Sequence, residues 1–219
     1  MCGRYSLTQT APELATAFDL AEPPAWTPRY NIAPTQILPT IIQTRTGQQF
    51  QQLRWGLIPG WAKDPVIGAR LINARAETLA EKPSFRAAFK QRRCLVLADG
   101  FYEWKRTSGK KQPFYFQRQD RAPFAFAGLW EEWQQQETTI RSFTIITTQA
   151  NSLLQPVHDR MPVILTRQAY ALWLEPSTPR ERLQTLLVPL DPDLMNGYPV
   201  SSLVNSPAND QADCIKISG

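Results

Sequence analysis

Short stretches in which apolar and polar residues alternate recur along the chain, and this period of two predicts half-buried β-strands. Residues 94–98 (CLVLA) instead form an unbroken apolar run, which is typical of a fully buried strand. Two tight turns are expected, at residues 46–47 (TG) and 108–110 (SGK), because glycine readily adopts left-handed backbone conformations. The other predicted strands are residues 37–43, 51–58, 101–106, 114–117, 124–130 and 142–147.

Helical patterns are fewer and shorter than strand patterns. Thr10 followed by Glu13 is a capping box, and with Pro12 in the first turn it predicts a helix over residues 11–20. The proline-rich residues 22–34 are expected to form an ordered loop. Further helices are predicted at residues 76–91 with a break at Pro83, at 167–174 and at 180–187.

These elements predict an α+β fold, with a mostly antiparallel β-sheet or barrel-like core and short peripheral helices. The chain has 219 residues, 42% hydrophobic and 20% charged, which fits one globular domain over residues 1–219. No apolar run approaches the roughly 20 residues that cross a bilayer, and no signal peptide precedes the first strand. We therefore expect no membrane contact, a cytoplasmic location that is nucleoid-associated if the cell is bacterial, and a monomer.

The three cysteines, Cys2, Cys94 and Cys214, are odd in number and far apart, so they do not predict a disulfide framework. A single histidine and no CxxC pair argue against a zinc site, and we expect no metal. The glycine-rich motifs of dinucleotide and P-loop sites are missing from the sequence, so no nucleotide cofactor is expected either.

The net charge is +5, which only weakly favours a polyanionic partner. The residues between 85 and 111 are more informative, because they hold eight lysines and arginines with only two acids, and three aromatic residues lie among them. Such a segment is able to hold phosphates and stack bases. The alternative is a solvated helix face followed by a charged hairpin. The basic residues are Arg86, Lys90, Arg92, Arg93, Lys105, Arg106, Lys110 and Lys111.

Position 2 offers distinctive chemistry. Initiator methionine is normally removed before a small residue, so the mature chain is expected to begin at Cys2 with a free α-amine and a thiol. The usual pKa of an α-amine, about 7.7–8.0, leaves a useful fraction unprotonated at neutral pH and able to form an imine with an aldehyde. The thiol can then close a thiazolidine ring on the imine carbon, and an open abasic deoxyribose offers such an aldehyde. The alternative is an incidental cysteine at a frayed terminus.

Three other residues are candidates for chemistry. Glu103 lies among aromatic residues, where desolvation would raise its pKa toward the range for acid–base work, unless it is a surface glutamate paired with a neighbouring cation. His158 titrates near neutrality and suits proton transfer, but a lone histidine also serves as a structural hydrogen-bonding residue. Asn73 is suited either to orient an amine or sugar or to cap the helix that follows.

Taken together, several stretches resemble the SOS-response-associated peptidase family, whose domain is called SRAP. They run in family order along most of the chain. The matching stretches are residues 1–4 (MCGR), 29–34 (RYNIAP), 55–61 (WGLIPGW), 72–78 (INARAET), 93–105 (RCLVLADGFYEWK) and 158–162 (HDRMP), with 199–201 (PVS) and 204–205 (VN) near the C-terminus.

The resemblance implies the SRAP fold, binding of single-stranded DNA, and a thiazolidine crosslink between Cys2 and abasic sites in that DNA. It implies that Asn73 positions the cysteine terminus and that Glu103 and His158 move protons. The DNA contacts that it implies are phosphate binding by Arg4, Arg75 and Arg160, a lesser contact by Thr147, and shaping of the groove by Pro34, Trp61 and Trp104.

Two departures from the family pattern concern DNA contacts. Pro83 stands where some members have an arginine, which puts one phosphate contact in doubt, and Ala62 replaces a second aromatic residue after Trp61, which puts stacking on a duplex end in doubt. Strand cleavage by β-elimination is expected to accompany trapping, because an imine forms on the way. Two alternatives stay open. Cys2 is the nucleophile of a thiol peptidase or autopeptidase with His158 as base, or the chain is a non-enzymatic single-strand binder.

Overall fold

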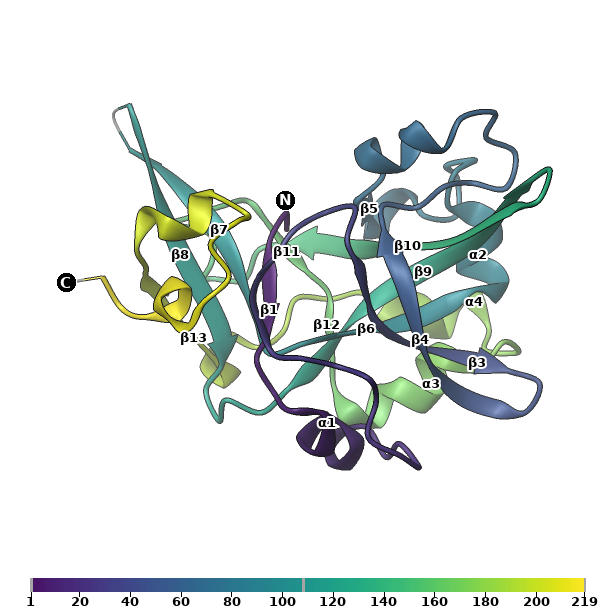
Figure 1. The fold of residues 1–219 in the computed structure, drawn as a ribbon, viewed down its shortest axis with the longest axis horizontal. Helices are drawn as coiled ribbons and strands as arrows, with labels where there is room; N and C mark the ends of the chain where they lie inside the picture. The colour runs from purple at the N-terminus through teal and green to yellow at the C-terminus, as the bar shows by residue number, and fades with distance from the viewer. Residues whose placement is uncertain (1, 108, 219) are drawn as a thin grey trace.

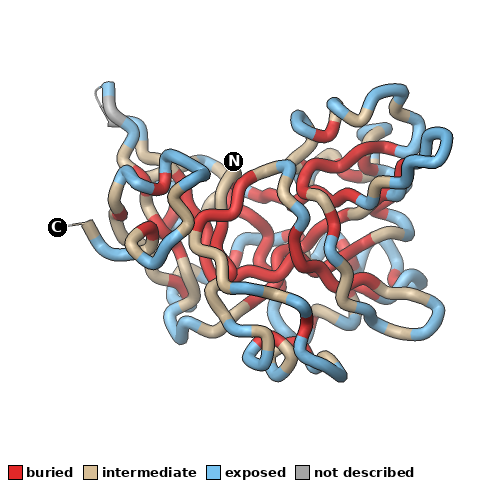
Figure 2. The backbone as a smooth tube through the Cα atoms, viewed as in Figure 1, coloured by how far each residue is buried: buried red, intermediate tan, exposed pale blue. Residues whose placement is uncertain are grey.

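The computed structural model describes residues 2–107 and 109–218, without the side chains of Thr107 and Lys110. Five strands form a closed barrel in the order β10-β4-β3-β6-β9, because β9 also pairs with β10 (Figure 1). The backbone of these strands is largely buried (Figure 2). The barrel strands are β3 (Ile37–Thr44), β4 (Gly47–Trp55), β6 (Arg93–Ala98), β9 (Phe124–Gln135) and β10 (Thr138–Gln149).

A second, fully antiparallel sheet packs beside the barrel in the order β13-β8-β7-β1-β2. Its aromatic residues enter the barrel core, where Tyr5 lies 5.2 Å from Trp55 and Phe101 lies 6.0 Å from Phe126, measured between ring centroids. This packing fixes the N-terminal strand and β7 against the barrel. The strands are β1 (Tyr5–Leu7), β2 (Arg29–Ile32), β7 (Gly100–Thr107), β8 (Lys110–Arg118) and β13 (Met195–Pro199).

Short strands and helices complete the fold. β5 (Asn73–Arg75) runs parallel to β10, while β11 (Arg160–Pro162) and β12 (Ile164–Leu165) extend the barrel sheet. The α-helices are α1 (Ala11–Ala17), α2 (Arg86–Gln91), α3 (Tyr170–Leu174) and α4 (Arg180–Thr185). The 3₁₀ turns are Pro65–Arg70, Ala76–Thr78, Arg167–Ala169, Pro192–Leu194, Ser202–Asn205 and Ala212–Ile215. None of the helices in the described ranges has the length and apolar content to span a membrane.

The α+β prediction is confirmed, and so are the predicted strands. The helix expected over residues 11–20 begins as predicted, with the Glu13 carboxylate accepting a 2.7 Å hydrogen bond from the Thr10 amide, but it ends at Ala17. Asp19 has a left-handed φ of 53°, which turns the chain out of the helix. The predicted hairpin turn falls partly on Ser108, outside the described residues, although β7 and β8 do pair around it.

Two predictions are wrong. The helix expected over residues 76–91 is α-helical only in α2, because Pro83 cannot continue a helix and the chain before it forms a 3₁₀ turn and loops. The loop expected over residues 22–34 contains β2, whose amides at Tyr30 and Asn31 donate to the carboxylate of Asp210. That partner is distant in sequence, so local composition gave no sign of the strand.

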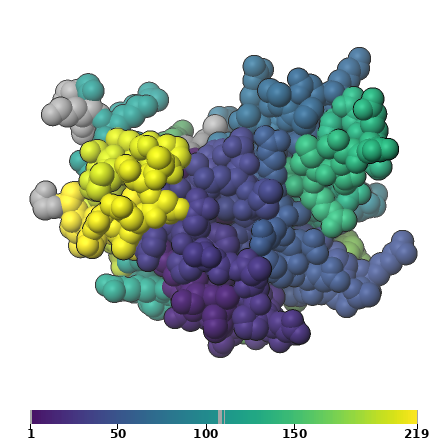
Figure 3. Space-filling view, in the orientation of Figure 1, coloured from purple at the N-terminus to yellow at the C-terminus, as the bar shows by residue number. Residues whose placement is uncertain are grey.

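The C-terminal residues form a strap across the N-terminal region, and the two lie in contact on one face of the molecule (Figure 3). Asn31 on β2 donates through its side chain to the carbonyl oxygens of Val204, Ser206 and Asn209. Arg4 donates to the side chain of Asn31 at 2.8 Å and to the carbonyl of Val204 at 2.7 Å. The strap therefore holds β2 and the residues just before β1 in place.

Candidate functional site

Cys2 is fixed by the fold rather than lying on a loose terminus. It precedes β1 directly and has no exposed surface. Its carbonyl oxygen accepts a 2.8 Å hydrogen bond from Nδ2 of Asn73. Burial raises the pKa of the Cys2 thiol well above its usual value, and the nearby negative charge of Glu103 acts in the same direction. The thiol is therefore kept protonated.

Asn73 begins β5, where it pairs with Ile145 of the parallel strand β10. The alternative that it caps a following helix is wrong, because its side-chain amide points to the N-terminal segment and α2 begins only at Arg86. Its Oδ1 is buried and accepts no hydrogen bond from the described residues. Asn73 thus presents an amide oxygen beside the backbone of Cys2, where it can accept a hydrogen bond from an amine.

Glu103 lies in the middle of β7 and is only 3% exposed. Strand alternation places its neighbours Tyr102 and Trp104 on the other face, where their rings lie 6.4 Å apart. Burial raises the pKa of Glu103 above the usual range of a glutamate, and a positive charge at His158 acts in the opposite direction. The alternative of a solvent-exposed surface glutamate is wrong. A buried carboxyl of this kind can exchange protons near neutral pH.

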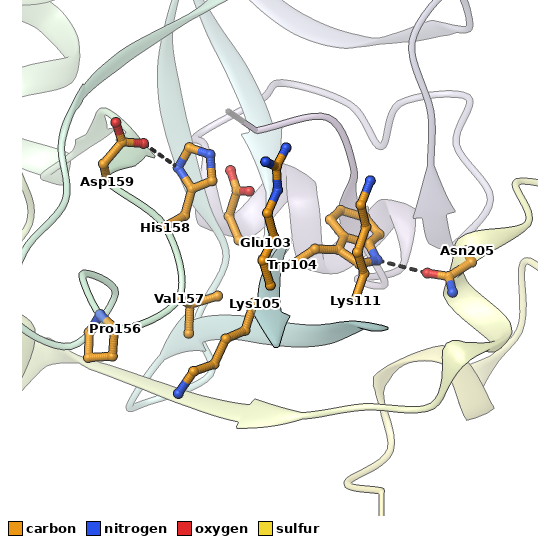
Figure 4. Close-up of a pocket in the computed structure, with 10 residues that line it drawn as sticks. Glu103, Trp104, Lys105, Lys111, Pro156, Val157, His158, Asp159 and Asn205 are labelled. Atoms are coloured by element: carbon orange, nitrogen blue, oxygen red, sulfur yellow. Dashed lines mark hydrogen bonds and ion pairs between the residues drawn. The ribbon is translucent and has the colours of Figure 1, made fainter. Parts of the chain in front are cut away.

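His158 lies in the loop before β11, and its ring lies next to Glu103 (Figure 4). Its Nδ1 accepts a 3.0 Å hydrogen bond from the backbone amide of Arg160. Because that amide can only donate, the neutral ring carries its proton on Nε2. The carboxylate of Asp159 lies 3.1 Å from Nδ1, a contact that becomes attractive when the ring is protonated.

Glu103 and His158 share the wall of a cavity of about 730 Å³ between β7, the loop before β11 and the C-terminal strap (Figure 4). The cations on its border come from the β7–β8 hairpin, while Pro156 and Val157 supply an apolar side. A cavity with two proton-exchanging groups and a positive border fits a phosphate-bearing substrate. Its lining is completed by Trp104, Lys105, Arg106, Lys111, Asp159 and Asn205.

Two of the predicted phosphate-binding arginines are engaged with their own chain. Arg160 forms a two-pronged ion pair with Glu77 at 2.7 and 3.0 Å and donates to the carbonyl of Thr147 at 2.7 Å. Arg4 is held by Asn31 and the strap. Their positions next to the candidate site agree with the sequence analysis, and contact with phosphate stays a prediction for both.

The remaining predicted DNA contacts occupy different environments. Arg75 is exposed at the end of β5 and lies opposite Thr147, which is buried. Trp61 is 60% exposed in the segment after β4, whereas Pro34 is half-buried after β2. Trp104 is half-buried at the cavity. An exposed tryptophan is able to stack on a base, so Trp61 keeps the role expected of it as a prediction.

The structure adds Asn205 to the site, a residue to which sequence reasoning assigned no role. Its Oδ1 accepts a 2.7 Å hydrogen bond from Nε1 of Trp104, and its carbonyl oxygen accepts from Arg4 at 3.4 Å. Asn205 therefore orients two predicted DNA contacts at once. Only folding brings it to the cavity, since it lies about a hundred residues from Trp104 in sequence, and no local pattern marks it.

Comparison with known proteins gives a consistent result. The abasic site processing protein YoqW of Bacillus subtilis (strain 168) is 46% identical over 222 residues, covering 99% of both chains. The abasic site processing protein YedK of Escherichia coli (strain K12) is 28% identical over 224 residues, again covering 99% of both. A crystal structure of a protein from Bacteroides thetaiotaomicron superposes with a TM-score of 0.88 at 28% identity, covering 99% of this chain and 100% of that one.

Residues 1–207 match the family described as SOS response associated peptidase (SRAP). The match includes all the stretches that carried the resemblance in the sequence up to the strap. It also includes the four segments that bring Cys2, Asn73, Glu103 and His158 together. The chain is a member of the SRAP family.

Proposed function

We propose that this protein acts on abasic sites in single-stranded DNA and traps them as a covalent thiazolidine through Cys2. The observation that carries the proposal is the convergence of Cys2 with Asn73 and Glu103. Four segments far apart in sequence contribute to one site. The names of the relatives, abasic site processing proteins, support the same class of substrate.

The chemistry needs no cofactor. The α-amine of Cys2 attacks the C1′ aldehyde carbon of the open sugar, and loss of one water leaves an imine. The thiol sulfur then adds to the imine carbon while its proton passes to the nitrogen, which closes the five-membered ring. One C–N and one C–S bond replace the C=O bond, with no change in oxidation state. Side-reaction of the imine by β-elimination would cleave some of the DNA.

Each site residue has a task in this scheme. Glu103, whose raised pKa keeps part of it protonated, gives a proton to the departing hydroxyl and accepts the thiol proton during ring closure. His158 assists opening of the sugar ring through the proton on Nε2. Asn73 holds the carbonyl of Cys2 and so fixes the direction of the amine.

Access to Cys2 depends on the N-terminus. Cys2 has no exposed surface in the chain that retains residue 1, so trapping requires removal of Met1, which lies outside the described residues. The DNA strand is then held by the positive border of the cavity, at Lys105, Arg106 and Lys111, and by stacking on Trp61.

A thiol peptidase is the weaker candidate. A cysteine nucleophile needs a lowered pKa, usually through an adjacent cation. Burial and the charge of Glu103 instead raise the pKa of Cys2. A protonated thiol suits ring closure on an imine, in which the amine makes the first attack.

The test is denaturing gel electrophoresis of the protein mixed with single-stranded DNA that contains one abasic site, alongside intact-mass analysis of the terminus. We expect a heat-stable shifted band with the trimmed protein and none with undamaged DNA. Cys2→Ala should give no band. Cys2→Ser keeps the amine, so it should give a band only after borohydride reduction of the imine. Full crosslinking by Cys2→Ala would refute the proposal, and equal binding to intact and abasic DNA without a covalent product would favour a plain binder.

A further inference from the structure

The basic segment between residues 85 and 111 does not form one surface. Its second half borders the Glu103 cavity, whereas Arg86 and Lys90 lie on α2, at the end of the molecule away from the β7–β8 hairpin (Figure 1). Between the halves, Arg92 pairs with Glu131 at 2.6 Å and Arg93 is buried. The cations of α2 are therefore not accounted for by the proposed reaction.

These cations border a second cavity, of about 450 Å³, between α2, α4 and the segment after α3. Its floor is apolar, with Phe89 and Leu183 almost completely buried beneath it. Arg86, Phe89 and Lys90 have the spacing of one helical face, which is why α2 presents an aromatic floor with a charge on either side. The rest of the lining is Ala80, Pro176, Ser177, Thr178 and Arg180.

The border of this cavity carries an uncompensated positive charge. Within the described parts of the chain, the side chains of Arg86, Lys90 and Arg180 form no ion pair or hydrogen bond. The neighbouring carboxylate of Glu175 accepts hydrogen bonds from the amide and hydroxyl of Ser177 instead. Glu81 and Glu181 adjoin the lining in sequence without belonging to it. The cavity thus combines three available cations with an apolar floor.

The cavity is also preformed, because a buried guanidinium fastens its walls together. Arg93 is 2% exposed and donates to the carbonyl oxygens of Phe89 and Lys90 at the end of α2. The same guanidinium donates to the carbonyls of Trp173 and Glu175 after α3. A binder of this site finds both walls already in place, which lowers the entropic cost of association.

We propose that this second cavity binds an acidic peptide segment of a partner protein that carries one bulky apolar side chain. The apolar side chain occupies the floor and carboxylates meet the three cations. A DNA strand fits less well, because the floor offers no hydrogen-bond donor and Phe89, 4% exposed, presents no open face on which a base can stack. The site lies away from Cys2, so a partner can be held while the reaction proceeds.

The proposal is tested by fluorescence anisotropy with a labelled peptide of four aspartates followed by a C-terminal phenylalanine. We expect saturable binding that weakens at least tenfold in the double variant Lys90→Glu, Arg180→Glu. Arg45→Glu, at the exposed β3–β4 turn, is the matched charge reversal and should bind as the native protein does. A peptide that ends in alanine should bind at least tenfold more weakly, because it lacks the apolar anchor.

Three results would overturn the proposal. They are the absence of saturable binding, equal weakening by Arg45→Glu, and equal affinity for the alanine peptide, which would mean that charge alone attracts it. Crosslinking to abasic DNA is measured in parallel and should be unchanged in the double variant. Loss of single-strand affinity in that variant would instead assign the cavity to DNA. Failure of crosslinking in the native protein would count against the proposed function only.

Discussion

The side-chain amide of Asn73 donates a 2.8 Å hydrogen bond to the carbonyl oxygen of Cys2, joining β5 to the start of the chain. This contact fixes the backbone of the residue whose amine and thiol are proposed to react. Because β5 is itself paired with β10 of the barrel, the direction of the terminus is set by the core of the protein.

Asn73→Ala should therefore slow crosslinking while leaving the fold intact. Loss of one hydrogen bond, about 1–1.5 kcal/mol, corresponds to roughly a tenfold lower rate. The rate is measured by quenched gel assays at saturating DNA. Asn196→Ala on β13 is the matched control, since its Oδ1 is likewise buried with no partner among the described residues. Equal rates for both variants would remove the positioning role of Asn73.

Glu103→Gln should reduce activity and increase stability. Burial holds the pKa of Glu103 above its unfolded value, so stability from this group is fully present below about pH 4.3 and is lost as pH rises through the folded pKa. We expect the glutamine variant to have a higher Tm than the native protein at pH 8 and a similar one at pH 4. Crosslinking should fall about a hundredfold. A lower Tm at pH 8 would contradict this account.

The cations of the β7–β8 hairpin should determine the salt dependence of DNA binding. Each phosphate contact to a single strand contributes about 0.7 to the slope of log affinity against log salt. Replacing Lys105, Arg106 and Lys111 by alanine should therefore lower that slope by about 2. The titration uses undamaged DNA, so that covalent trapping does not interfere. Arg45→Ala should leave the slope unchanged, and a slope unaffected by the triple variant would place the strand elsewhere.

Arg93→Met should be among the more destabilising single substitutions. The guanidinium satisfies four backbone carbonyl oxygens, and removing it leaves buried acceptors without partners. We expect a loss of about 3 kcal/mol in the free energy of unfolding, measured by urea denaturation. Arg92→Met, which removes only a partly exposed ion pair with Glu131, should cost under about 1 kcal/mol. Similar losses for the two would show that the carbonyls find other partners.

The sequence predicted best where the signal was local. Alternation along residues 100–107 placed Glu103 on the face opposite Tyr102 and Trp104, and the apolar run of β6 marked a central strand. Contacts between distant segments were beyond it. The engagement of Arg160 by Glu77, the strand β2 completed by Asp210, and Asn205 at the cavity all depend on residues that only the closed fold brings together.

The strap has a consequence for the order in which the molecule becomes functional. Translation delivers Cys2 first and the residues that secure Arg4, at Val204 and beyond, almost last. During synthesis the aminothiol end is unshielded and open to any small metabolic aldehyde. The ribosome must release the chain before that end is locked into place, so newly made and mature protein should differ sharply in their susceptibility to such poisoning.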